Sequence, residues 1–166
     1  MDSLGGYSVM KKTLLFIMII VMVYVGVSCG IYSSATADKK RSEELLQYLS
    51  DKDVEGLKGM FCSKIAKGVT FEDEIEAAME FFKGKVKSHD SMIGGGNSSA
   101  IERGRIIRYE IRPLIRNIET DAGKMYEIRF YSYHIHVEQE DVVGISLLTI
   151  KDTETDEIYQ VGELID

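Results

Sequence analysis

The fold is decided by residues 113–128, PLIRNIETDAGKMYEI, which join two apolar strands through a four-residue turn. In that turn, Thr120-Asp121-Ala122-Gly123, glycine occupies the fourth position of a type I turn, as is typical of a bulged hairpin. The turn pairs Thr120 with Lys124. It therefore sets the register of two long predicted strands, residues 103–119 and 124–138.

This register predicts cross-strand pairs that are apolar on both sides, the pattern that stabilises a hairpin with one buried face. The expected pairs are Ile118–Tyr126, Leu114–Phe130, Ile111–Tyr133, Tyr109–Ile135 and Ile107–Val137. Near Pro113, the only proline of the chain, the apolar positions of both strands change parity. Proline in a strand marks an edge or a bulge, and the register places it opposite Tyr131. We therefore expect the buried side to change along the sheet.

Further strands continue the same pattern towards the C-terminus. Residues 142–151 form a third predicted strand with the same parity change, and residues 158–161 form a short last strand. Residues 94–99, GGGNSS, are followed by neither a Gly-Lys-Ser/Thr element nor a helix, so they are not a phosphate loop. They are predicted to be a flexible connection. The C-terminal half thus predicts a strongly bent antiparallel sheet of four to five strands.

Three helices are predicted before the sheet. Apolar residues recur at helical spacing in residues 45–49 and again in residues 54–65, with Asp53 as the N-cap of the second helix. The third helix follows Thr70, which starts a capping-box pattern, and acidic residues occupy its first turn. Three helices followed by such a sheet suggest an α+β cone of the cystatin-like, nuclear-transport-factor-like type. We expect this domain to occupy residues 38–166.

The N-terminal segment predicts where the protein resides. Lys11-Lys12 precede an uncharged apolar run that closes with Val25-Gly26-Val27-Ser28-Cys29, the layout of a secretory signal. This stretch resembles a bacterial lipobox, which implies lipidation of Cys29 and cleavage before it. Residues 1–28 would then be the signal peptide and residues 29–37 a flexible tether. The domain would be anchored to the cell membrane, facing outside the cytoplasm.

Two alternatives remain open for this segment. Thr13 to Tyr32 is 20 residues without a charge, and about 20 apolar residues suffice to span a bilayer. An uncleaved transmembrane anchor is therefore the second interpretation, with the C-terminal domain again outside the cytoplasm. Translation from Met10 instead of Met1 would give a more typical signal start.

Charge and cysteine content narrow the classes of function. Removing residues 1–28 takes away Lys11, Lys12 and Asp2, so 20 basic and 27 acidic residues become 18 and 26, a net charge of −8. This balance argues against nucleic acid as a partner and against direct adhesion to anionic lipid. If Cys29 is lipidated, Cys62 has no partner for an intrachain disulfide. A buried, inert thiol is the expected state of Cys62.

The chain resembles a family of bacterial lipoproteins known only as a domain of unknown function. The resemblance rests on the lipobox, on Gly94-Gly95-Gly96, and on residues 113–118 and 120–128, together with the helical stretch from about Glu43. It implies a relation to the nuclear-transport-factor-like superfamily, in which dimers are common, so a homodimer is possible. It implies no activity, cofactor or functional residue.

One strand face carries the candidate functional residues. Arg108, Glu110 and Arg112 alternate along the first long strand and so share a face. The predicted register places His136, His134 and Ser132 across from them, with Glu138 next along.

Three interpretations of this face stay open. His134, His136 and a carboxylate from Glu110 or Glu138 have the ligand types of a zinc site, although the flanking arginines oppose a cation. Arg108, Arg112 and His134 suit an anion or a polar ligand. A solvated face with a Glu110–His134 cross-strand pair is the third interpretation.

Signatures of catalysis are missing from the sequence. It has no Gly-x-Ser-x-Gly elbow, no paired-cysteine metal spacing and no His-Glu-x-x-His, and its apolar strand positions carry no acid. No cofactor or metal is expected. The sequence therefore favours a membrane-anchored module that binds a small ligand or a protein, and a small cone-fold hydrolase or isomerase is the alternative.

Overall fold

The helical part of the domain precedes the sheet in the chain. The structure is a computed structural model that describes residues 38–90 and 93–165. Residues 38–51 are helical, and three short helices follow. These are α2 (Val54–Lys58), α3 (Ser63–Ala66) and α4 (Phe71–Phe81). Asp53 caps α2 as predicted, because its Oδ1 accepts a hydrogen bond from the Gly56 N–H at 2.8 Å.

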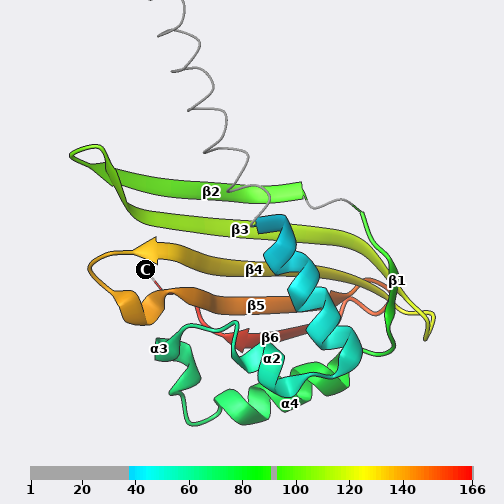
Figure 1. Cartoon of the computed structure of the whole chain (residues 1–166). Helices are drawn as coiled ribbons and strands as arrows, with labels where there is room; N and C mark the ends of the chain where they lie inside the picture. Colours follow the sequence, from blue (N-terminus) through cyan, green and yellow to red (C-terminus); the bar gives the residue numbers. More distant parts are fainter. Residues whose placement is uncertain (1–37, 91–92, 166) are drawn as a thin grey trace, which may run out of the picture. The chain divides into compact units, whose positions relative to one another are not determined.

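One sheet of six strands forms the rest of the domain (Figure 1). The strands are β1 (Val86–Ser88), β2 (Ile93–Glu102), β3 (Arg105–Thr120), β4 (Met125–His136), β5 (Gly144–Asp152) and β6 (Ile158–Gly162). Their order is β1-β3-β4-β5-β6, and β2 pairs with the same edge of β3 as β1 does. All of these pairings are antiparallel, and the 3-10 helix η1 (Glu140–Val142) precedes β5.

The α+β class is as predicted, but the numbers of strands and helices are not. The sheet has six strands where four to five were expected, because residues 94–99 lie within β2 instead of forming a loop. The described residues hold four α-helical segments, apart from the 3-10 helix η1, where three helices were expected. The predicted helix over residues 54–65 is interrupted because Phe61 forms a parallel bridge with Ile145 of β5. The Cys62 N–H donates to the Ile145 carbonyl, and the Ile145 N–H donates to Met60, both at 2.9 Å.

The hydrophobic core lies between the helices and one side of the sheet, here termed the inner face. Leu45 and Leu49 from the first helical segment and Ile75 from α4 are fully buried there. The strands contribute Ile111, Ile115, Ile118, Tyr126, Ile128, Phe130, Leu148, Ile150 and Val161. The sheet side turned away from these residues is the outer face.

The predicted register of the β3–β4 hairpin is right at both ends and wrong in the middle. The Thr120 N–H donates to the Lys124 carbonyl at 3.0 Å, and Ile118 faces Tyr126 as expected. Tyr109 also faces Ile135 as expected, and the Val137 N–H donates to the Ile107 carbonyl. Between these ends Leu114 faces Arg129 instead of Phe130, and Ile111 faces Ser132 instead of Tyr133.

Two bulges cause this offset and cancel each other. Arg116 and Asn117 of β3 stand opposite one residue of β4, and Asn117 has a left-handed φ of 52°. Further along, β4 has the extra residue, His134, between the pairs Tyr109–Ile135 and Glu110–Tyr133. A bulge inserts one residue and so moves later side chains to the other face.

The predicted change of buried side at Pro113 is therefore wrong. The apolar positions change parity at the two bulges themselves. The same side of the hairpin, the inner face, is therefore buried along its whole length. In β5 an extra residue, Ser146, has the same effect between Ile145 and Leu148. Leu114 and Leu147 point to the outer face and lie outside the core cluster. Figure 1 shows β3 and β4 curving towards their shared turn, as bulged strands do.

Candidate functional site

The structure brings four of the five predicted site residues to the outer face of the sheet. Arg108 pairs with His136 as expected, and Glu110 and Arg112 alternate with Arg108 along β3. Glu110 faces Tyr133, not His134, so the predicted Glu110–His134 pair is wrong. The cause is the bulge at His134, which shifts the partner of Glu110 by one residue.

His134 lies on the inner face. Its ring contacts the Tyr109 ring edge-on, with centroids 5.7 Å apart, whereas the His136 ring contacts Tyr133 at 5.3 Å. Tyr109 and Glu110 are neighbours in β3 and so point to opposite faces. The two imidazoles are therefore separated by the sheet, although their spacing of two residues predicts a shared face.

This separation removes the basis for the predicted zinc site. Its two histidines do not converge on one side of the sheet. Within the part of the chain that the structure describes, no three metal-ligating side chains gather around a common point.

A preorganised cluster stands at the centre of the outer face. Arg112 Nε donates to Glu110 Oε1 at 2.6 Å, and the Arg112 guanidinium carbon lies 5.3 Å from the centre of the Tyr131 ring. The Glu110 carboxylate raises the pKa of Arg112 through this hydrogen bond. The Glu110 side chain is only 11% exposed, and that of Arg112 is 48% exposed. The ion pair therefore neutralises a buried carboxylate and fixes a partly exposed guanidinium on an aromatic ring.

Two further residues of this surface, Tyr131 and Arg129, are not predicted by the sequence pattern. Arg129 lies on the outer face of β4 opposite Leu114, and Tyr131 follows it on the same face, between the pairs Leu114–Arg129 and Ile111–Ser132. With Glu110 and Arg112 they form what is here named the arginine–tyrosine cluster. The shifted register that places them beside Arg112 has no sequence signal apart from Asn117, a residue type that tolerates left-handed backbone.

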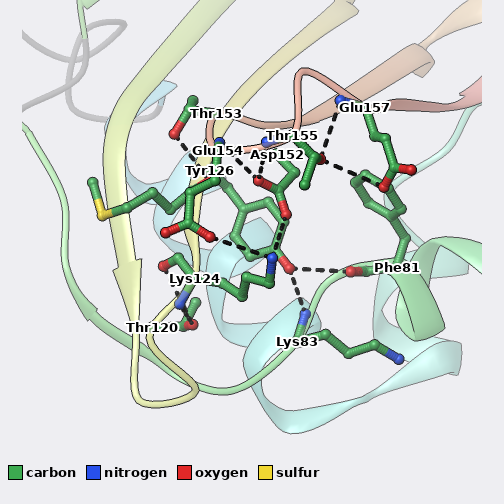
Figure 2. A network of polar contacts seen from close by, with 11 residues as sticks. Phe81, Lys83, Thr120, Lys124, Tyr126, Asp152, Thr153, Glu154, Thr155 and Glu157 are labelled. Atoms are coloured by element: carbon green, nitrogen blue, oxygen red, sulfur yellow. Dashed lines mark hydrogen bonds and ion pairs between the residues drawn. The ribbon is translucent and has the colours of Figure 1, made fainter.

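A polar network around the buried Asp152 connects the β3–β4 turn to the β5–β6 turn (Figure 2). Lys124 Nζ contacts Asp152 Oδ2 at 3.0 Å and Glu154 Oε2 at 3.3 Å. Asp152 Oδ1 accepts hydrogen bonds from the backbone N–H groups of Glu154 and Thr155. Burial raises the pKa of Asp152, but these hydrogen bonds and Lys124 outweigh it, so the pKa is lowered overall. Each partner is satisfied within the network, which fits a role in stability.

Two shallow clefts flank the helices. One, of about 300 Å³, lies between the first helical segment and β1 and is lined by Leu46, Asp51, Lys85 and His89, among others. The other, of about 270 Å³, lies between α3, α4 and the end of β6. In the first cleft Lys85 pairs with Asp51 at 3.5 Å.

The predicted signal, its lipidation site at Cys29 and the tether lie outside the described residues. Within the described ranges no helix has both the length and the apolar character that crossing a bilayer requires. The chain belongs to the family described as a domain of unknown function (DUF5104), whose model matches residues 44–157. None of the curated proteins matches the chain in sequence.

Proposed function

We propose that this chain is a lipid-anchored protein of the cell surface whose outer sheet face binds an acidic partner protein. The observation that carries the binding role is Arg112, which is held between Glu110 and Tyr131 while its side chain stays 48% exposed. Val25 to Cys29 supports the location, because its small and apolar residues suit cleavage and lipidation at Cys29. A cone of the nuclear-transport-factor-like type is the architecture that we propose for the family.

The arginine–tyrosine cluster has the composition of a protein contact. Tyrosine and arginine are enriched among residues that dominate binding energy, and fixed side chains lose little entropy on binding. Arg112 is already neutralised by Glu110. By contrast, Arg108 and Arg129 are exposed and make no ion pair within the described residues. These two cations favour a partner that presents carboxylates.

The anchor is tested by palmitate labelling of the full chain and of Cys29→Ala. We expect the label to disappear in the variant and globomycin to leave an unprocessed precursor. Retained label in Cys29→Ala would exclude lipidation at this cysteine.

The binding surface is tested by photo-crosslinking in living cells. A crosslinking amino acid replaces Tyr131 in the full chain, and the matched control replaces Val69, which is 99% exposed between α3 and α4. We expect an adduct that depends on position 131 and disappears with Arg129→Glu. Identical adducts from both positions, or adducts unaffected by Arg129→Glu, would count against the proposal.

The enzyme alternative has weaker support. A buried carboxylate beside an apolar pocket is a common catalytic base. Among the described residues the two buried carboxylates are Glu110 and Asp152, and each is ion-paired. Both are therefore committed to neighbouring cations.

A further inference from the structure

The tip of the β2–β3 hairpin, residues 101–106, presents apolar and basic side chains together. Ile101 pairs with Ile106, and these side chains are 66% and 47% exposed. Arg103 and Gly104 form the turn, and Arg105 follows it opposite Glu102. Neither arginine makes an ion pair within the described residues. An exposed apolar pair therefore stands next to two arginines and one glutamate, so the tip carries a net charge of +1.

The turn places one of these cations at the outermost point of the hairpin. Arg103 and Gly104 have φ angles of 48° and 77°, as a two-residue type I′ turn requires. Asparagine, aspartate and glycine are the residues that adopt such angles readily, and a positive φ is uncommon for arginine. Local conformational preference does not explain an arginine at this position.

The tip also extends beyond the last pairing of β3 with β4. Pairing between β3 and β4 ends near Ile107, whose carbonyl accepts the Val137 N–H. Two further strand residues, Ile106 and Arg105, at about 3.3 Å each, carry the turn about 7 Å beyond that point. Figure 1 shows the β2–β3 turn at the same end of the sheet as the end of β4. The segment after β4, with Glu138, Glu140 and Asp141, leads to β5 on the side of β4 away from β3, and its loop reaches nearly as far in this direction as the tip (Figure 1).

We propose that this tip docks onto the surface of a lipid bilayer with anionic headgroups. The inference rests on the proposed lipid anchorage, since residues 30–37 could extend at most about 28 Å from Cys29 and would keep the domain beside the membrane. Branched aliphatic side chains enter the apolar boundary, while arginines reach the phosphates. The net charge of the chain argues against adhesion to anionic lipid, but the local charge of the tip favours it. A protein contact is the less suitable occupant, because residues 101–106 contain no aromatic anchor.

The absence of tryptophan from the sequence permits a direct test. Ile106→Trp places a single reporter at the tip, and Val69→Trp places one at a fully exposed control position. The full lipidated chain is reconstituted in vesicles of anionic or zwitterionic lipid, with and without brominated acyl chains. We expect blue-shifted emission and quenching by brominated lipid for Ile106→Trp only, strongest in anionic vesicles. Replacing Arg103 or Arg105 with glutamine should weaken docking about fivefold each.

Other outcomes overturn the proposal in distinguishable ways. If both reporters behave alike while flotation still shows the chain on vesicles, docking is wrong and anchorage stands. If the emission of Ile106→Trp is blue-shifted only in native membranes and not in vesicles of pure lipid, a protein occupies the tip. If flotation fails, anchorage is wrong. Titration of the unanchored Ile106→Trp chain with vesicles then measures the affinity of the tip alone. The absence of a response in this titration would reject docking of the tip.

Discussion

Asp152 is the buried carboxylate on which the β5–β6 turn depends. Asp152→Ala removes the ion pair with Lys124 and both backbone hydrogen bonds, so we expect a loss of about 3 kcal/mol in the free energy of unfolding. Asp152→Asn keeps an oxygen acceptor for the turn, so its loss in the free energy of unfolding should be about half as large. Urea titrations of both variants measure the difference. Equal losses would show that the turn hydrogen bonds contribute nothing.

The same residue predicts how stability depends on pH. The pKa of Asp152 in the folded chain is lowered from its ordinary value of 3.8, so the unfolded state binds the proton more tightly. The stabilisation is complete above about pH 4 and is lost as the pH falls through the folded pKa. Acid titration monitored by circular dichroism should therefore show a steeper loss of stability in the native chain than in Asp152→Asn.

Tyr126 joins the sheet to the end of α4. Its hydroxyl donates to the Phe81 carbonyl at 3.1 Å and accepts the Lys83 N–H at 3.0 Å (Figure 2). Tyr126→Phe should cost about 1 kcal/mol, measured by urea unfolding. Burial raises the pKa of Tyr126 above 10, so the folded state holds its proton longer and stability should fall as the pH rises through 10. An identical alkaline stability profile for Tyr126→Phe would contradict this assignment.

At the scale of elements, the glycine-rich start of β2 is set by close backbone approach. A Cβ on Gly95 would lie 1.9 Å from the Arg112 carbonyl oxygen. Gly95→Ala should therefore push β2 away from β3 and cost about 1–3 kcal/mol. Gly59→Ala is the matched control, because its Cβ meets nothing nearer than 3.4 Å and its φ is −62°. Thermal melts should show the first variant destabilised and the second unchanged or slightly stabilised.

Local signals predicted the elements better than their pairing. The Asp53 cap and the turn at Thr120 were readable because each depends on a few neighbouring side chains. Thr70 does precede α4, but its hydroxyl donates to Glu74 instead of capping a backbone N–H. The bulges at Asn117 and His134 were missed, since a bulge follows from packing across strands more than from composition. That error misplaced His134, and with it the candidate metal site.

At the scale of the whole molecule, Cys62 reports whether the domain opens as a unit. Its thiol is 1% exposed and lies in the core beside β5. We expect alkylation of Cys62 only through global unfolding, with a labelling rate that rises with denaturant in parallel with circular dichroism. Mass spectrometry of the peptide containing Cys62 gives the rate. Rapid labelling in native buffer would instead reveal a local opening between α3 and β5.

The two bulges of the β3–β4 hairpin also determine where related sequences can lose a residue without disturbing the sheet. Removing Asn117 would leave one residue facing one residue, so Ile115 and Ile118 would both still point inward. Removing Arg112, two rungs from a bulge, would instead turn over the strand beyond it. Deletions among relatives should therefore collect at Asn117, His134 and Ser146, the extra residues of the three bulges, because losing one of them restores one-to-one pairing without turning the strand over.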